Sequence, residues 1–121
     1  MSAFVDLGSL AQLRVWDGVH GRTIEGEQLT FALVELEPHA LVPAHSHPNE
    51  QVGVLLRGQM DWTIGGEHRL LEKPGEGWRI LGGVEHEVRA GPEGAVVIEA
   101  FAPPRHDWAG LEPSGRASTF P

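Results

Sequence analysis

Glycine and proline interrupt this chain every few residues, and short runs of alternating apolar and polar residues lie between the interruptions. The 121 residues include 16 glycines and nine prolines, a spacing that stops a helix of ordinary length from forming. Alternation with a period of two is typical of a β-strand with one buried face. We therefore expect short strands at residues 31–36, 51–56, 60–64, 68–72, 78–81, 86–89 and 95–101. No stretch carries a helical period, so the pattern predicts an all-β sandwich or barrel.

The length of the chain favours a single domain. Residues 1–28 are expected to contain N-terminal strands, which two copies of the chain could exchange. Residues 29–102 hold the regularly spaced runs and are expected to form the barrel, whereas residues 103–121 are rich in proline and predict an irregular tail. Within the barrel region, Gly65 and Gly66 predict a two-residue hairpin turn between neighbouring strands.

The charge and the composition exclude several classes of function. The formal net charge is −8 and the nine lysine and arginine residues are scattered, so the chain lacks the basic face that binds phosphates. No apolar run approaches the roughly 18 residues that cross a membrane, and residues 1–6 do not resemble the start of a secretory signal. The absence of cysteine excludes disulfides and thiolate metal ligands. We expect a cytoplasmic protein that binds neither nucleic acid nor membranes.

Two histidines separated by one residue, His45 and His47, are the clearest candidates for a functional site. Residues i and i+2 of a strand point to the same face, so both imidazoles can approach one ion. Gln51 follows in the same phase, although Pro48 can disturb that phase, and His86 can approach from a later strand. Imidazole binds zinc, iron, nickel and copper. A bare histidine pair also occurs on surfaces and in hydrogen-bonded cores, so the spacing alone leaves both interpretations open.

The stretch from His45 to Gly58 resembles the first motif of the cupin superfamily. That motif has two histidines flanking one residue, an acidic or amide position after three more residues, and a glycine after a further six. Gln51 occupies the acidic or amide position, which is usually glutamate, and Gly58 falls in place. The leading glycine of the motif is replaced by His39.

A second set of residues resembles the second cupin motif. Gly75, Gly83 and His86 stand at its spacing, whereas its proline is replaced by Leu81 and its final asparagine by Ala90. These departures concern turns and packing and leave the ligand positions intact. The two motifs occur in the expected order.

The cupin resemblance spans about residues 30–105 and implies an all-β double-stranded β-helix, the jelly-roll barrel of small single-domain cupins. It also implies one divalent transition metal ion, Zn, Ni, Fe or Mn, held by His45, His47, Gln51 and His86. Glutamine in the glutamate position leaves four neutral ligands, and the full charge on the ion then favours Lewis-acid chemistry. Glu50, one residue earlier, is the competing fourth ligand.

The last predicted strand carries a carboxylate among apolar residues. Glu99 shares a face with Phe101, and a buried carboxylate is costly unless it is paired or functional. With Arg105, these residues resemble the strand and exit loop of KdgF-like cupins, which convert cyclic unsaturated uronates to the linear keto form. The resemblance implies that Glu99, in place of an aspartate, transfers a proton, that Phe101 stacks on the ring and that Arg105 binds a carboxylate. The alternative is that Glu99 pairs with an arginine and Arg105 is a surface residue.

Other aromatic, sulfur and imidazole side chains have less specific patterns. Met60 and Trp62 alternate onto one face of a predicted strand, where they either wall a ligand site or form ordinary core. Four further histidines have no ligand spacing, and we expect surface or structural roles for His20, His39, His68 and His106.

Three functions are compatible with these residues. The first is a metal-dependent isomerase or ring-opening enzyme that acts on a small sugar acid. The second is an Fe(II)-dependent dioxygenase, and the third is a non-catalytic module that binds a small ligand. We expect a small-molecule ligand, and under the first function it bears a carboxylate that Arg105 binds. We also expect a homodimer, because a short barrel leaves strand edges exposed.

Overall fold

The computed structural model describes residues 2–120, which form antiparallel strands and two short 3-10 helices, η1 (Leu7–Ser9) and η2 (His106–Gly110). The outermost residues of the predicted N-terminal region and tail, 1 and 121, lie outside the described residues. The strands are β1 (Leu13–Trp16), β2 (Val19–Glu25), β3 (Thr30–Leu36), β4 (Leu41–His45), β5 (Glu50–Ile64), β6 (Glu67–Leu71), β7 (Gly77–Ile80) and β8 (His86–Ala102). The predicted all-β fold is therefore confirmed.

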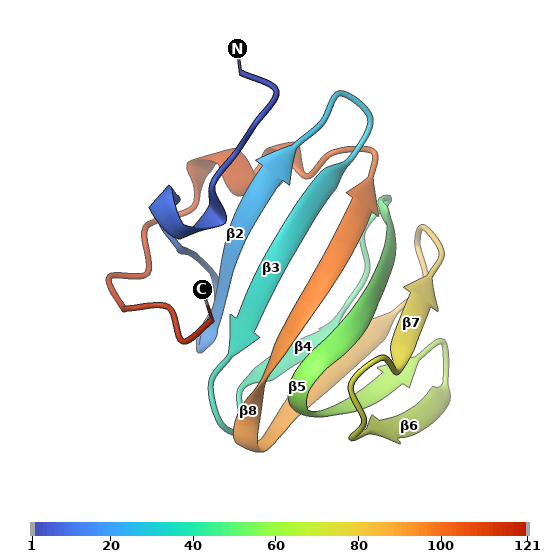
Figure 1. Ribbon diagram of the computed structural model, residues 1–121. Helices are drawn as coiled ribbons and strands as arrows, with labels where there is room; N and C mark the ends of the chain where they lie inside the picture. Colours follow the sequence, from blue (N-terminus) through green and yellow to red (C-terminus); the bar gives the residue numbers. More distant parts are fainter. Residues whose placement is uncertain (1, 121) are drawn as a thin grey trace.

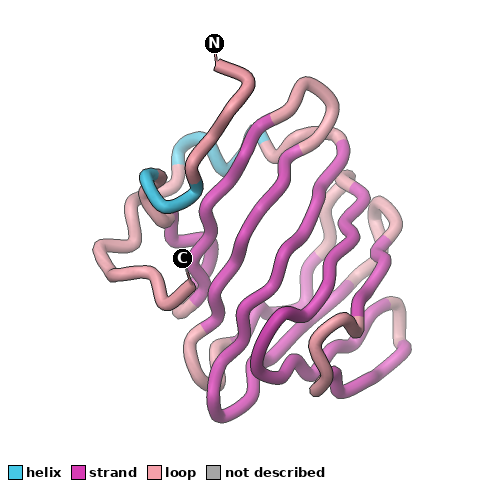
Figure 2. Tube along the Cα trace, viewed as in Figure 1, coloured by secondary structure: helices cyan, strands magenta, loops and turns pink. Residues whose placement is uncertain are grey.

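The strands close around a common interior because two of them are long enough to belong to both walls. The sheet order is β1-β2-β3-β8-β5-β6, with β4 on the first half of β8 and β7 on the first half of β5. Figure 1 shows β5 and β8 bending from the broad wall made with β2 and β3 toward the narrower wall near β4 and β6. Figure 2 shows that strands account for most of the trace. This is the jelly-roll arrangement that was expected.

Two pairs of runs that looked separate in the sequence are each one continuous strand. Residues 51–56 and 60–64 both belong to β5, and residues 86–89 and 95–101 both belong to β8. Glycine produced the apparent interruption in β5, because the register with β8 shifts on either side of Gly58. Gly58 has φ 90°, and a Cβ there would lie 2.1 Å from the Gly94 carbonyl oxygen. The glycine marks a bulge and close backbone contact within the strand.

Local turn chemistry predicted one connection correctly. Gly65 and Gly66 have φ 54° and 84°, and they join Ile64 to Glu67, which are register partners in the hairpin. Strands β1 and β2 form a hairpin within the same chain, so an exchange of N-terminal strands between copies stays a prediction. No helix within residues 2–120 has the length and apolar character needed to cross a bilayer.

The N-terminal segment and the tail pack against the outer side of the barrel around a buried ionic cluster. Glu35 is 3% exposed, and its carboxylate accepts hydrogen bonds from the Ser118 hydroxyl at 2.6 Å and the Thr119 amide at 2.7 Å. Arg22, equally buried, donates to the Leu7 and Phe120 carbonyl oxygens. Outside η2 the described residues of the tail form no helix or strand, and the tail is attached at defined points.

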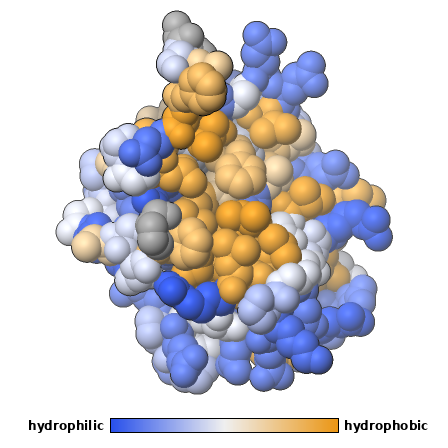
Figure 3. Space-filling model, viewed as in Figure 1, coloured by the Kyte–Doolittle hydropathy of each residue, from blue (hydrophilic) through white to orange (hydrophobic). Residues whose placement is uncertain are grey.

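Next to this cluster, the outer face of the broad wall carries a row of apolar side chains. Ile24, Phe31, Ala100 and Val52 are register partners across β2, β3, β8 and β5, so they point to one side of the sheet. Val52 is 42% exposed. In Figure 3 apolar surface gathers on the side of the molecule that Figure 1 shows. The opposite face of the same strands points into the barrel.

Candidate metal centre

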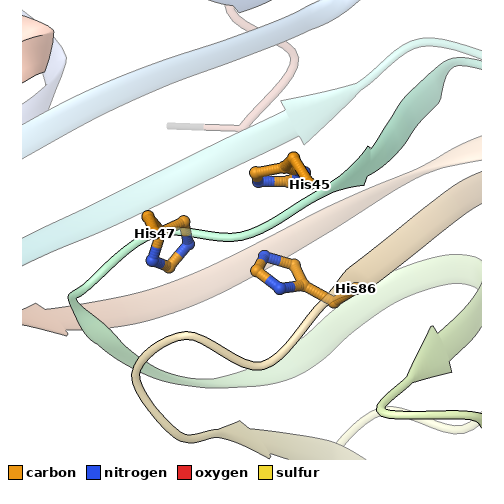
Figure 4. A group of neighbouring side chains, drawn as sticks. All are labelled: His45, His47 and His86. Carbon is orange, nitrogen blue, oxygen red and sulfur yellow. The ribbon is translucent and has the colours of Figure 1, made fainter.

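Three histidines from two parts of the chain converge inside the barrel. His45 ends β4, His47 lies in the turn after it, and His86 begins β8 as the register partner of His45. Their ring centroids are 4.3 Å apart for His45 and His86, 4.9 Å for His47 and His86, and 5.6 Å for His45 and His47. Figure 4 shows the three rings facing a common point. We expected one strand to carry both His45 and His47, but β4 ends at His45. The segment after β4 nevertheless directs the His47 side chain inward.

Backbone carbonyl oxygens select the same tautomer for all three rings. The Nδ1 atoms lie within hydrogen-bonding distance of carbonyl oxygens two residues away in the chain, at 2.8 Å for His45, 3.0 Å for His47 and 2.9 Å for His86. Because a carbonyl oxygen only accepts, each Nδ1 must carry the proton. The Nε2 lone pairs are then free for a ligand, which is the orientation that partners outside the coordination sphere impose on metal-binding histidines.

Burial keeps the inner ring uncharged and leaves it without a protein partner. The Nε2 atom of His86 is buried and has no hydrogen-bond partner in the part of the chain that the structure describes. Burial lowers the pKa of His86 to about 4, with smaller contributions from the neighbouring His45 and His47. Burial also lowers the pKa of His47. Neutral imidazoles are the form that binds metal.

The donor set fits a divalent transition metal ion. One ring nitrogen from each histidine lies within 4.8 Å of the others, and the unpartnered His86 nitrogen is the kind of buried polar atom that a bound ion would satisfy. Three neutral imidazoles suit zinc, nickel, iron and manganese to different degrees, and they do not select one of them.

Gln51 lies beside the triad, whereas Glu50 does not. Gln51 is 6% exposed, and its Oε1 atom is 3.1 Å from Nε2 of His47. With the His47 proton on Nδ1, both His47 Nε2 and Gln51 Oε1 present lone pairs to each other. A cation bound between these two atoms would satisfy both of them. Glu50 is solvent-exposed and lies outside the cluster of convergent ligands. The geometry favours Gln51 over Glu50 as the fourth ligand.

Glu99 contacts the other end of the Gln51 amide. Gln51 Nε2 donates to Glu99 Oε1 at 2.6 Å, so the amide connects this carboxylate to the histidines. Burial raises the pKa of Glu99 to about 7, a rise that is opposed by the Gln51 hydrogen bond and the charge of Arg105. A carboxyl group with this pKa can both donate and accept a proton near neutral pH.

Arg105 is held in one orientation at the edge of the site. Its Nε and Nη2 atoms donate to the two Asp107 carboxylate oxygens at 3.0 and 2.9 Å. Its guanidinium carbon lies 4.8 Å from the Phe101 ring centroid and 4.7 Å from that of Trp108. Nη1 makes no hydrogen bond within residues 2–120. The Nη1–Nη2 end of the group therefore remains available for a carboxylate.

These groups surround one cavity with an empty volume of about 500 Å³, measured out to its open mouth. The predicted residues His45, His47, Gln51, His86, Glu99, Phe101, Arg105, Met60 and Trp62 all line it. Met60 and Trp62 are buried at 1% and 4% exposure, and they also belong to the hydrophobic core. The two expectations for this pair, core and ligand wall, are therefore compatible.

The remaining histidines lie away from the triad and have structural contacts or surface positions. His20 is buried, with Nε2 2.6 Å from Glu37 and Nδ1 2.6 Å from the Ser114 hydroxyl. His68 and His106 are exposed. His39, which replaces the leading glycine of the first motif, is exposed and has φ 62°. The backbone thus keeps a glycine-type conformation at that position.

Sequence reasoning missed three residues of the site. Trp16 has its ring centroid 5.2 Å from that of His45 and lines the cavity, as Trp108 does. Asp107 orients Arg105 through the two hydrogen bonds described above. Asp107 and Trp108 lie two and three residues after Arg105 in the chain, so their closeness to Arg105 could have predicted that they belong to the site. Nothing in the sequence connects Trp16 with His45.

The fold agrees with the comparisons to known proteins. The Cupin domain family model matches residues 32–101, so the chain belongs to the cupin family. The chain is 29% identical over 94 residues to the pectin degradation protein KdgF of Dickeya dadantii (strain 3937), which covers 76% of this chain and 84% of that protein. These matches confirm the resemblance to small, KdgF-like cupins.

Solved structures support the same fold. KdgF from Halomonas sp. superposes with a TM-score of 0.79 at 23% identity, covering 88% of this chain and 98% of that one. An RmlC-like cupin from Shewanella frigidimarina NCIMB 400 superposes with a TM-score of 0.80 at 19% identity, covering 88% and 96%. At these identities the likeness establishes the jelly-roll fold.

Proposed function

We propose that this cupin is a metal-dependent isomerase that opens the ring of a small unsaturated uronate. The observation that carries the proposal is the contact between Gln51 and Glu99, which places a carboxyl group with a pKa near 7 beside a triad of neutral histidines. The 29% identity to a pectin degradation protein supports a uronate as the substrate.

In this proposal, His45, His47, His86 and Gln51 hold one divalent ion, which supplies Lewis-acid polarisation of a substrate oxygen when bound. The identity of that ion, among Zn, Ni, Fe and Mn, is set by supply in the cell as well as by affinity. Arg105 binds the substrate carboxylate through its free Nη1–Nη2 end. Phe101 and Trp62 contact the faces of the ring, and Met60 fills the interior below it.

Glu99 moves the proton. Opening a cyclic 4,5-unsaturated uronate breaks the bond between C1 and the ring oxygen, removes a proton from the C1 hydroxyl and adds a proton at C4. The reaction is an isomerisation, so one proton lost equals one proton gained, and no oxidant or second substrate is needed. A carboxylate can take the first proton and return it as the acid, which requires a pKa close to the working pH. The pKa of Glu99, raised to about 7 by burial, meets that requirement.

The direct test is to incubate 4,5-unsaturated galacturonate with protein loaded separately with Zn, Ni, Fe(II) or Mn. Loss of the ultraviolet absorbance of the conjugated acid, with the linear keto product identified by NMR, is the expected result. Glu99→Gln should reduce kcat at least about 100-fold, whereas Glu87→Gln, an exposed position on the same strand, should leave it unchanged. Absence of turnover with every metal contradicts the proposal. Oxygen uptake with Fe(II) would instead favour a dioxygenase.

We also propose that two copies associate through the outer face of the broad wall. The apolar row of Ile24, Phe31, Ala100 and Val52 contains no charge, so two chains that each carry a net charge of −8 can approach there without placing like charges in contact. Light scattering should give the mass of a homodimer, and Val52→Asp should give a monomer. A wild-type protein that is monomeric at tens of micromolar contradicts this part of the proposal. A cytoplasmic location likewise stays a prediction.

A further inference from the structure

The walls of the cavity offer very few hydrogen-bonding groups beyond those already given a role. Eighteen residues line the cavity, and its only charged, amide or imidazole side chains are His45, His47, Gln51, His86, Glu99 and Arg105. The other twelve are valine, leucine, methionine, phenylalanine or tryptophan, with no serine, threonine, asparagine or lysine among them. The lining tryptophans Trp16, Trp62 and Trp108 add indole N–H donors, and that of Trp62 is buried with no acceptor within residues 2–120.

Along the two lining strands β3 and β8, the backbone adds no further hydrogen-bonding groups. The apolar lining residues Val34 and Leu36 lie on β3, whose amide and carbonyl groups pair with β2 on one side and β8 on the other. Val97 lies on β8 between β3 and β5, where both of its edges are also paired. Main-chain groups in paired strands are already satisfied, so they cannot bind hydroxyl groups of a ligand.

From this composition we infer that the cavity selects a hydroxyl-poor ring carboxylate over a hydroxyl-rich one. Arg105 binds the carboxylate, and the Gln51–Glu99 pair with the triad faces the hydroxyl groups that the ring retains. The rest of the ligand faces apolar side chains such as Val34, Leu36 and Val97. Each additional hydroxyl buried without a partner lowers affinity by roughly tenfold, which corresponds to about 1.4 kcal/mol.

The inference rests on the proposed function and narrows its substrate class. A 4,5-unsaturated uronate lacks the C4 hydroxyl of its saturated parent, and its C4 and C5 atoms are planar. The cavity should therefore discriminate between the unsaturated ring and the saturated sugar acid by rejecting the extra hydroxyl. Two aromatic rings that line the cavity, Trp16 and Trp108, can contact the hydroxyl-poor face of such a ring.

The test compares two six-membered rings that bear one carboxylate each, cyclohexanecarboxylate with no hydroxyl and galacturonate with four. Binding to zinc-loaded and nickel-loaded protein is measured by calorimetry and by fluorescence of the tryptophans that line the cavity. We expect cyclohexanecarboxylate to bind at least about tenfold more tightly. Equal binding, or tighter binding of galacturonate, overturns the inference.

A pair of variants checks that the probe occupies this cavity. Arg105→Gln should weaken cyclohexanecarboxylate binding at least about tenfold, because it removes the charged partner of the carboxylate. Arg69→Gln, whose side chain is 69% exposed, should leave binding unchanged. Binding that survives Arg105→Gln at full affinity places the probe elsewhere and also overturns the inference.

These measurements need no turnover, so the two proposals fail separately. If the affinities follow the expected order and unsaturated galacturonate is not converted, the cavity preference stands and the isomerase proposal is wrong. If unsaturated galacturonate is converted while galacturonate binds as tightly as cyclohexanecarboxylate, the isomerase proposal stands and the preference is wrong.

Discussion

Replacing Glu99 with glutamine should stabilise the metal-free protein at pH 8 and have little effect on its stability at pH 4.5. The carboxyl group is buried, with 8% of the residue exposed, and burial raises its pKa to about 7 from an ordinary value of 4.5. Above pH 7 the native state must hold this group ionised in an apolar environment. Glutamine is nearly isosteric, remains neutral, and keeps an oxygen that can accept the Gln51 hydrogen bond.

The magnitude follows from the size of the pKa rise. Between pH 4.5 and 7 the native state holds the Glu99 proton while the unfolded state has lost it, so the free energy of unfolding decreases as the pH rises. One pKa unit corresponds to about 1.4 kcal/mol, and a rise of this size therefore costs about 3 kcal/mol once the pH is above 7. Glu99→Gln should recover that amount at pH 8. A gain in stability that accompanies loss of activity is typical of a functional carboxylate.

His86 acts in the opposite direction over nearly the same pH range. Burial lowers its pKa to about 4 from 6.5, so the unfolded state binds a proton that the native state excludes. The free energy of unfolding therefore decreases as the pH falls from 6.5 toward 4, again by up to about 3 kcal/mol. In the wild-type protein the effects of His86 and Glu99 largely cancel between pH 4.5 and 6.5. In Glu99→Gln the dependence on His86 should become visible.

Urea denaturation in the presence of a chelator, at half-unit steps from pH 4.5 to 8, measures both effects. The stability difference between Glu99→Gln and the wild-type protein should grow with pH and level off above pH 7. Glu87→Gln, exposed on the same strand, should give a small difference without pH dependence. If Glu99→Gln changes stability by the same amount at every pH, or destabilises most at pH 8, then Glu99 is ionised in the native state and the reasoning is refuted.

Three further predictions concern the metal ligands and one strained residue. His86→Ala should abolish stoichiometric metal binding, measured by elemental analysis after dialysis, and full retention would exclude His86 as a ligand. Gln51→Glu should tighten metal binding in titrations but lower metal-free stability at pH 8 by about 1–3 kcal/mol, because two carboxylates then face each other where an amide now donates; an unchanged urea midpoint would contradict the observed contact. His39→Gly should raise stability by about 0.5–1 kcal/mol because φ is 62°, and a lower melting temperature would contradict it.

Most of the secondary structure that could be predicted came from patterns among residues close together in the chain. Alternation identified the strands from residue 30 onward except β4, and Gly65 and Gly66 identified a hairpin, because both depend on residues close together in the chain. The continuity of β5 and β8 could not be predicted. A glycine looks like an end of a strand in the sequence, and only the partner strand reveals it as a bulge.

The histidine triad was likewise predicted only in part from the sequence. Histidine is the residue type that allows a metal site, and the motif spacing identified His45, His47 and His86 together with Gln51. The distances among them depend on β4 pairing with the start of β8, two segments separated by about forty residues. The tautomers depend on carbonyl oxygens whose positions only the folded backbone defines.

The sequence by itself determined the all-β class, the candidate ligand types and the presence of a carboxylate in the last strand. Tertiary structure alone decided that the Gln51 amide joins Glu99 to the histidines, although strand alternation had already predicted that Gln51 lies on the side of His47. It also decided that Arg105 is oriented by Asp107 and that the cavity walls are apolar. The physical reason is that hydrogen-bond partners and burial come from segments far apart in the chain, and these set the charge state and the orientation of each group.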